Sequence, residues 1–307
     1  MDTVVFGAGS LGSLVGGLLA REHDVTLVAR EDHARAVRES GLRVCGEFDE
    51  RVVPNATTDG RNLAADLAVV AVKSFDTASA AAALATGSFD AVLSLQNGMG
   101  NEAVLAERLE PGTPVLAGTA TYGAVLREPG VVECTGRGEI VLGDRDGGAS
   151  DRANAVGEAF TAAGLETAVV DDMPRWLWEK LAVNAGINPV TALTGTTNGA
   201  VLEPPARDLA RAATREAARV ARERGVALSN REAVDAMETV AEATAANTSS
   251  MAQDLRQERR TEIDAINGYV VDRAAESGLE VPTNRHLTAL VRTWEEGRGL
   301  REEPGEE

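Results

Sequence analysis

Apolar and polar positions alternate in two ways along the first half of the chain. Short runs of β-branched and other apolar residues predict buried strands, and the stretches between them have the spacing of helices. This alternation is typical of a parallel sheet with helices on both faces, the α/β class. Strands are predicted at 3–6, 25–29, 69–72, 91–95 and 115–117, and helices at 11–22, 32–40, 77–85 and 101–109.

The pattern changes near Asp171. Before it, apolar pieces at 131–134 and 139–142 suggest antiparallel additions to the sheet, and a helix at 151–163 and a strand at 166–170 follow. After it, all periodic segments are helical, at 175–186, 189–194, 205–224, 230–246, 251–277 and 283–296. We therefore predict an α/β domain over 1–171, an all-helical domain over 172–298 and an acidic tail over 299–307.

Charge narrows the classes of partner. The chain has 48 acidic and 30 basic residues, a net charge of −18, and a field of this sign repels phosphate backbones and anionic lipid. Nucleic-acid and membrane-surface roles are therefore not expected. Only two of the basic residues are lysines, Lys73 and Lys180. Acid excess with so little lysine is a halophilic type of composition, although codon bias in a GC-rich genome would also replace lysine by arginine.

Nothing in the sequence suggests a metal site or a disulfide framework. Cys45 and Cys134 form no Cys-x-x-Cys pair, and the three histidines lack metal-ligand spacing. The uncharged stretch 3–20 lacks the basic region of a signal peptide and holds five glycines, which suit a turn better than a membrane helix. We therefore expect a cytoplasmic protein.

The first predicted strand runs directly into a glycine-rich loop. Gly7, Gly9 and Gly12 have the G-x-G-x-x-G spacing between a strand and a helix, which is the setting of a dinucleotide-binding loop. The candidate cofactor-binding residues are Gly7, Ala8, Gly9, Ser10, Leu11 and Gly12. At the end of the next strand Arg30 stands where an NAD site usually has an acid, and this favours NADP. Glu31 and Asp32 follow at once, so NADH stays an alternative.

Two polar residues follow later strands of the predicted sheet. Lys73 and Asn97 each come after a buried run, and open α/β sheets bind their ligands at the carboxyl ends of strands. Lys73 therefore falls where a functional residue is expected. For Asn97 a role as a turn former is the alternative, because Asn-Gly is a common turn dipeptide.

The most specific pattern lies in the helix predicted at 175–186 and its continuation. Lys180, Asn184 and Asn188 are spaced i, i+4, i+8 and share one face, and Trp178, Leu181 and Ala185 form an apolar stripe beside it. Pro189 is expected to end this helix. A lysine in a partly desolvated cleft has a lowered pKa and can protonate the oxygen of a ketone that receives a hydride.

A second polar group precedes the predicted helix 251–277. Residues 247–250 are cap-forming, so a helix cap alone would explain them, and Glu262 by itself resembles a surface acid. If 250–262 were one straight helix, Ser250 and Glu262 would be about 18 Å apart along its axis. Both can contact one small ligand only if the chain bends between them.

These motifs together resemble the ketopantoate reductase (2-dehydropantoate 2-reductase) family over nearly the whole chain. The most specific parts are 180–184 with 187–192, and 247–268. The resemblance implies a Rossmann-type domain with a mostly parallel sheet, and an all-α C-terminal domain of the 6-phosphogluconate-dehydrogenase type. It also implies NADPH-dependent reduction of a ketoacid to (R)-pantoate, in pantothenate and coenzyme A biosynthesis, with a homodimer as the suggested assembly.

The resemblance also implies roles for individual residues. Lys180 would be the general acid, and Glu262 would contact both substrate and cofactor. Arg30 and Lys73 would lie near the 2′-phosphate, and Asn97 and Ala124 would contact NADPH. The substrate-binding set would be Asn97, Asn184, Asn188, Asn198, Asn247 and Ser250. The alternatives are a related 2-ketoacid or β-hydroxyacid dehydrogenase of the same architecture and a non-catalytic dinucleotide sensor.

Overall fold

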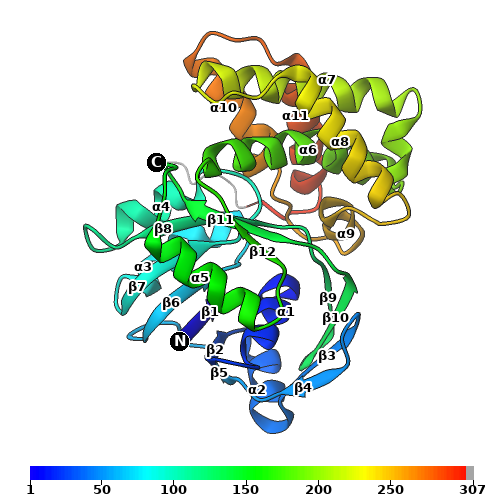
Figure 1. Cartoon of the computed structure of the whole chain (residues 1–307). Coiled ribbons are helices and arrows are strands. Elements are labelled where there is room, and N and C mark those ends of the chain that lie inside the picture. Colours follow the sequence, from blue (N-terminus) through cyan, green and yellow to red (C-terminus); the bar gives the residue numbers. More distant parts are fainter. Residues whose placement is uncertain (302–307) are drawn as a thin grey trace. The chain divides into compact units, whose positions relative to one another are not determined.

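The computed structural model describes residues 1–301 and divides the chain into two compact units (Figure 1). The N-terminal unit comprises residues 1–96 and 100–174, and the helical unit comprises residues 97–99 together with the chain from Arg175 onward. Of the acidic tail predicted at 299–307, residues 302–307 lie outside the described residues.

An eight-stranded sheet forms the centre of the N-terminal unit. β1 lies among parallel neighbours, whereas β11 pairs antiparallel with β8, as the sequence predicts for an addition to the sheet. The strands in spatial order are β12 (Thr167–Val169), β11 (Ile140–Asp144), β8 (Val115–Ala120), β7 (Ser88–Ser94), β6 (Ala64–Val70), β1 (Asp2–Phe6), β2 (Asp24–Val28) and β5 (Asn55–Thr57). The predicted mostly parallel α/β sheet is confirmed.

Helices cover both faces of this sheet because its strands are apolar on both sides. Val5 packs in a core with α1 and α5, whereas Val4 and Phe6 pack in a separate core with α3 and α4. The helical elements of the unit are α1 (Ser10–Leu19), α2 (Glu31–Ser40), the short η1 (Ser74–Asp76), α3 (Thr77–Leu84), α4 (Asn101–Arg108) and α5 (Asp151–Ala162).

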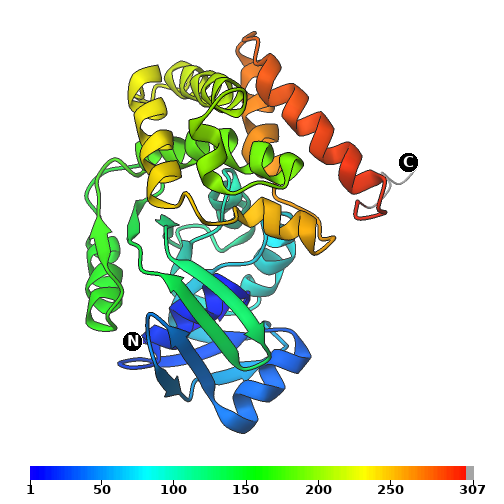
Figure 2. The same ribbon diagram turned by 90° about the vertical axis from the view of Figure 1, so that its right-hand side faces the viewer.

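A second, four-stranded sheet was not predicted. Its order is β4 (Glu50–Val52), β3 (Leu42–Gly46), β10 (Val131–Gly136) and β9 (Gly123–Glu128), and Figure 2 shows its strands in blue and green. α1 packs between the two sheets through adjacent glycines. A Cβ on Gly16 would lie 2.5 Å from Leu27 of the main sheet, and one on Gly17 would lie 3.0 Å from Leu42 of the second sheet. Residues 131–134, predicted as an antiparallel addition to the main sheet, instead form β10 of this second sheet, which pairs parallel with β3 and antiparallel with β9.

The helical unit is built around α6 (Met173–Thr194). This helix is apolar on two sides: Trp178, Leu181 and Ala185 pack in one core, and Val183 and Ile187 pack in another. The other elements are η2 (Asn198–Leu202), α7 (Ala206–Glu223), α8 (Asn230–Ala243), α9 (Ser250–Arg256), η3 (Asp264–Gly268), α10 (Tyr269–Glu276) and α11 (Pro282–Glu296). No strand occurs between residues 175 and 301, as predicted.

Two helix predictions were wrong. α6 continues through Pro189 to Thr194 instead of ending after Asn188, and the Ala185 carbonyl that the proline leaves without a helix partner accepts a hydrogen bond from the Asn267 side chain. The helix predicted at 251–277 is broken after Arg256. Glu258 has a φ of +48°, which a continuing helix does not allow, and helical structure resumes as the π-helical η3.

Candidate active site

The predicted polar stripe lies on the central helix of the helical unit. Since α6 is continuous from Met173 to Thr194, Lys180, Asn184 and Asn188 do share one face. Asn188 is buried, and Lys180 and Asn184 are half-buried. The neighbouring stripe of Trp178, Leu181 and Ala185 is buried, so the amine and the amides are held by a helix that is itself fixed in the core.

The surroundings of Lys180 suit proton transfer near neutral pH. Burial lowers the pKa of Lys180 from the usual 10.5 to about 8, and the Glu262 carboxylate opposes this change because a negative charge favours the ammonium form. A donor whose pKa is close to the working pH is the most effective general acid. The predicted candidate acid therefore has an environment that favours this chemistry.

Glu262 is a buried carboxylate, not the surface acid that it resembles in the sequence. Its side chain is 5% exposed, and Asn97 Nδ2 donates to its Oε2 over 3.3 Å. Residues 97–99 pack closely on η3: Met99 N donates to Ala265 O over 3.0 Å, and a Cβ on Gly98 (φ +79°) would lie 2.5 Å from Ala265 Cβ. The structure thus brings together Lys180, Glu262 and Asn97 from three separate parts of the sequence.

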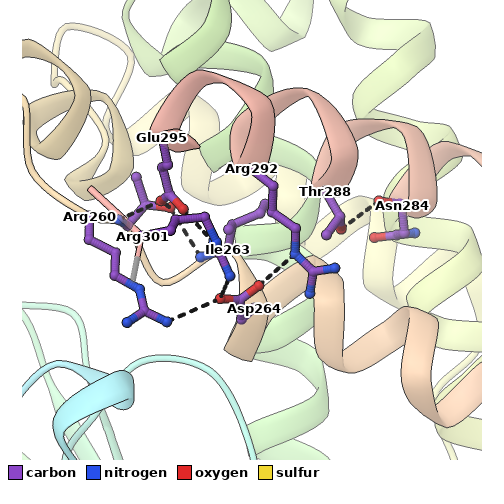
Figure 3. Close-up of polar contacts among 9 residues, drawn as sticks. Arg260, Ile263, Asp264, Asn284, Thr288, Arg292, Glu295 and Arg301 are labelled. Carbon is purple, nitrogen blue, oxygen red and sulfur yellow. Dashed lines mark hydrogen bonds and ion pairs between the residues drawn. The ribbon is translucent and has the colours of Figure 1, made fainter. Parts of the chain in front are cut away.

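A network of ion pairs holds the segment that carries Glu262 (Figure 3). Glu295 is fully buried, and one of its oxygens accepts from Thr261 N (2.7 Å) and Thr261 Oγ1 (2.6 Å). The other oxygen accepts from Arg301 Nη1 at 2.5 Å. Arg301 Nη2 also binds Asp264 Oδ2 at 2.6 Å, and Arg292 binds Asp264 Oδ1 at 2.7 Å. The residues on both sides of Glu262 are therefore anchored.

This ion-pair network was missed from the sequence. Its members are ordinary acids and arginines in an acidic protein, and the sequence has no signal that distinguishes them from surface charges. The arginines hold the pKa of the Asp264 carboxyl below its usual value against the opposing effect of burial. The break between α9 and η3 also resolves the spacing problem, because Ser250 and Glu262 are not on one straight helix.

Three further predicted substrate residues lie at or just before the starts of η2 and α9, in two segments joined by hydrogen bonds. Asn198 N donates to Asn247 O over 2.9 Å, and Asn198 Nδ2 donates to Thr244 Oγ1 over 3.0 Å. Asn198 Oδ1 is buried and has no hydrogen-bond partner within residues 1–301. The side chains of Asn247 and Ser250 are exposed. Asn198 is thus the one of the three with a buried, unpaired acceptor.

Of residues 247–250, which were predicted to be cap-forming, Ser249 is the residue that caps α9. Ser249 Oγ accepts from Ala252 N over 3.2 Å and so caps α9, whereas Ser250 is the first residue of that helix. Ser249 Oγ also lies 2.7 Å from Thr191 Oγ1 of α6. The loop is therefore fastened to the same helix that carries the polar stripe.

The glycine loop has the geometry that a pyrophosphate requires. Gly7 has a φ of +89°, and a Cβ on it would lie 2.6 Å from Val72 N. A Cβ on Gly12 would lie 2.3 Å from Gly7 O, whereas Gly9 has nothing closer than 4.0 Å. Open space at Gly9 lets a ligand approach the backbone at the start of α1, where no acidic residue opposes an anion.

The other glycine-loop residues have definite partners. Ala8 N donates to Val28 O over 3.0 Å, and Ser10 Oγ accepts from Leu126 N over 3.0 Å. Ser10 therefore ties the loop to β9, the strand that also contains Ala124. Leu11 packs at the edge of the core beneath. The loop fits a dinucleotide through its backbone, and the Ser10 hydroxyl has a structural role as well.

Arg30 is available for an anion. The acids that follow it are occupied elsewhere: Glu31 accepts from Arg38 over 3.1 Å, and Asp32 accepts from Arg35 over 2.9 Å. Arg30 is exposed and has no ion-pair partner in the described part of the chain. Lys73 is half-buried directly before η1, after the end of β6. The surroundings of Arg30 fit a 2′-phosphate.

Gln96 connects two strand ends near these residues, a role that its type and position in the sequence do not indicate. Its Nε2 donates to Val72 O over 3.2 Å and to Thr77 Oγ1 over 2.7 Å. Thr77 in turn donates to Asn101 Oδ1 over 2.9 Å. These bonds fix the carboxyl ends of β6 and β7, which precede Lys73 and Asn97.

Within residues 1–301 no group of three or more His, Cys, Asp or Glu side chains could hold a metal ion. In the same range, no helix has the length and apolar character needed to cross a membrane.

The chain matches one family along both units. The family described as ketopantoate reductase PanE/ApbA matches residues 3–147, and its C-terminal counterpart matches residues 172–295. The 2-dehydropantoate 2-reductase of Halobacterium salinarum is 48% identical over 95% of this chain and 98% of its own length. The chain belongs to the ketopantoate reductase family.

Other members of the ketopantoate reductase family are similar over the same length. The 2-dehydropantoate 2-reductase of Archaeoglobus fulgidus is 39% identical over 95% of this chain and 97% of its own. The crystal structure of a PanE/ApbA family ketopantoate reductase from Ralstonia eutropha superposes with a TM-score of 0.89 at 36% identity, and the match covers 97% of this chain and all of that one. The predicted combination of a Rossmann-type and an all-helical domain is therefore shown.

Proposed function

We propose that this ketopantoate reductase family member reduces 2-dehydropantoate to pantoate, with NADPH preferred to NADH. The observation that carries the proposal is the placement of Lys180 beside the Glu262 carboxylate on a helix face lined by Asn184 and Asn188. The names of the similar reductases from H. salinarum and A. fulgidus support the choice of substrate.

Lys180 carries the proton chemistry in this proposal. A reduced nicotinamide cofactor held at the glycine loop would supply the hydride to the ketone carbon, and the ketone oxygen would then gain alkoxide character. The Lys180 ammonium stabilises that oxygen and donates its proton to it. With a pKa of about 8, the amine is mostly protonated at neutral pH and still able to release the proton. The Glu262 carboxylate keeps more of the lysine in the donor form.

The amides and hydroxyls orient the ketoacid. Asn184 and Asn188 extend the stripe from Lys180, and Asn198, Asn247 and Ser250 supply further polar groups in this assignment. The buried, unpaired Asn198 Oδ1 is an acceptor and so suits the terminal hydroxyl of 2-dehydropantoate. That hydroxyl distinguishes 2-dehydropantoate from simpler branched ketoacids.

A comparison of two substrates tests this function. We would follow the nicotinamide absorbance in high salt with 2-dehydropantoate and with 3,3-dimethyl-2-oxobutanoate, which lacks only the hydroxyl. A site that binds the hydroxyl should favour the first by roughly 10³-fold or more in kcat/KM. Equal use of both would indicate a general 2-ketoacid dehydrogenase instead. No oxidation of NADPH or NADH with either substrate would reject the proposal.

The preference for NADPH has its own test. Arg30→Ala should raise KM for NADPH by roughly tenfold or more, because a charge-assisted hydrogen bond to phosphate is lost, and should leave KM for NADH unchanged. Arg152→Ala is the control, since Arg152 is also an exposed arginine of the N-terminal unit and pairs with Asp90. Equal effects of Arg30→Ala on both cofactors would remove Arg30 from the 2′-phosphate site. The cytoplasmic location and the homodimer stay predictions.

A further inference from the structure

The helix that carries Lys180 contains a proline in its interior. Residue 189 of a regular helix would donate its N–H to the carbonyl of Ala185, but Pro189 has no N–H. Ala185 is fully buried, so water cannot take the place of the missing donor. The helix therefore needs a donor from elsewhere at a point between Asn184 and Asn188.

Asn267 supplies that donor from η3. Its Nδ2 lies 3.0 Å from Ala185 O and 2.9 Å from Asn284 Oδ1. The orientation of the amide is settled by chemistry, because a backbone carbonyl only accepts. In η3 itself, Gly268 N donates to Ile263 O over 2.9 Å, the i→i−5 bond of a π-turn. This turn follows Glu262 directly, so the donor and the carboxylate belong to one short structured segment.

Packing alone does not explain an asparagine at this position. Asn267 is fully buried, and its Oδ1 has no hydrogen-bond partner within residues 1–301. Burying an unpaired carbonyl oxygen is unfavourable, and an apolar side chain of similar volume would avoid it. The amide is therefore present for the bonds that its Nδ2 donates.

Asn267 connects the two residues assigned to the reaction. Ala185 lies on the rigid helix of Lys180, and Asn267 lies on the segment of Glu262, whose other end is anchored by Thr261 and Glu295. The remaining contacts between these elements include apolar packing around Leu181, Ile263 and Ile266, which is not directional. A hydrogen bond has a fixed length and direction, so it determines the distance between α6 and the Glu262 segment more closely than apolar packing does.

We propose that Asn267 is a positioning residue: its Nδ2 replaces the N–H that Pro189 lacks and thereby sets the separation of the Lys180 ammonium from the Glu262 carboxylate. The catalytic part of this inference rests on the proposed function, whereas the structural part does not. Asn267 contacts neither reacting group in this assignment and acts through the helix that it holds.

The decisive experiment restores the missing donor in another way. Asn267→Ala leaves Ala185 O without a partner and should lower kcat by roughly tenfold to a hundredfold through misplacement, with a smaller change in KM. Pro189→Ala restores a helix N–H to the same carbonyl and should by itself change kcat little. The double variant should then recover most of the kcat lost in Asn267→Ala, which a loss of packing alone would not allow.

Thr214→Val is the matched control. Thr214 Oγ1 also donates to a buried α6 carbonyl, that of Ala182, at 3.1 Å. The helix N–H of Gly186 still serves that carbonyl when the hydroxyl is removed. Thr214→Val should therefore keep kcat and the Lys180 titration of the wild type. A loss as large as that of Asn267→Ala would show a general sensitivity of α6 and overturn the inference.

A readout without substrate separates this inference from the proposed function. Lysine labelled with ¹³C at Cε gives two lysine signals in this chain, from Lys73 and Lys180. The Lys180 titration should shift in Asn267→Ala and return toward that of the wild type in the double variant. If wild type is inactive on 2-dehydropantoate but this shift and return occur, the function fails and the positioning role stands. An unchanged titration, or a kcat loss that Pro189→Ala does not repair, would overturn the positioning role.

Discussion

Removing the Glu262 charge should lower the pKa of Lys180 further. Burial has already lowered this pKa from 10.5 to about 8, against the effect of the carboxylate. At about 1.36 kcal/mol per pH unit, the net change corresponds to about 3 kcal/mol against the charged amine. Glu262→Gln keeps the shape of the side chain and removes the charge that favours the ammonium form. Its Lys180 should therefore titrate below about 8.

The assay uses the scarcity of lysine. With ¹³Cε-lysine the wild type should show one signal titrating near 8, and Lys73→Arg assigns it. The pH profile of kcat should fall on its basic side with the same midpoint, since only the ammonium form of Lys180 donates a proton. This midpoint should move to lower pH in Glu262→Gln. A Lys180 midpoint near 10.5, or an upward move in Glu262→Gln, would refute the electrostatic account.

The same pKa predicts how stability depends on pH. Below about pH 8 Lys180 is charged in both states, and the folded state bears the full cost of burying it. Between about 8 and 10.5 the unfolded chain holds more protons, so the free energy of unfolding rises with pH by up to about 3 kcal/mol. Lys180→Met should remove this rise and stabilise the protein at pH 7 while abolishing turnover. A less stable Lys180→Met protein at pH 7 would contradict the burial cost.

Three further predictions concern stability. His33 Nδ1 accepts from Gly130 N over 3.0 Å, its Nε2 therefore donates to Ser13 Oγ, and burial lowers the pKa of His33. The free energy of unfolding should therefore be full above about pH 6.5 and fall below it. A urea midpoint that does not change from about pH 6.5 to about 5, or whose pH dependence is the same in His33→Gln, would contradict this. Arg301→Ala should lower the free energy of unfolding by about 3 kcal/mol, because fully buried Glu295 loses its cation. Arg298→Ala removes an exposed ion pair and should lower it by less than about 1 kcal/mol. Equal urea midpoints for the two variants would be evidence against the role of Arg301 in holding the Glu262 segment. Raising the KCl concentration from about 0.1 to about 1 M shortens the Debye length from about 10 to about 3 Å. This screens the repulsion that arises from the net charge of −18 and should therefore raise Tm. A lower Tm at the higher salt concentration would contradict this prediction.

Local patterns in the sequence were sufficient for the architecture and for the centre of the site. Strand and helix periods depend on neighbouring residues, so the main sheet, its flanking helices and the shift to helices after Asp171 were predictable. The glycine loop was predictable because its spacing lies within one strand–turn–helix unit. The Lys180–Asn184–Asn188 face follows from the helical repeat, and the continuous α6 carries it as predicted.

Features that depend on distant partners were not predictable in this way. β3 pairs parallel with β10, a strand far from it in the sequence, and of the two only β10 was recognisable as an apolar piece. Glu262 resembles a surface acid until Asn97, Thr261 and Ala265 enclose its segment. Burial and ion pairing are properties of the folded chain, so composition could not reveal them.

Pro189 shows most directly why the sequence alone was not sufficient. By its local chemistry a proline ends a helix, because it removes one hydrogen bond and one donor. Whether the helix continues depends on the availability of another donor for Ala185 O, and that donor, Asn267, is distant in the sequence. The sequence by itself determined which residues share the face of Lys180. Only the tertiary structure decided that this helix continues past Pro189, because a side chain from η3 replaces the missing bond.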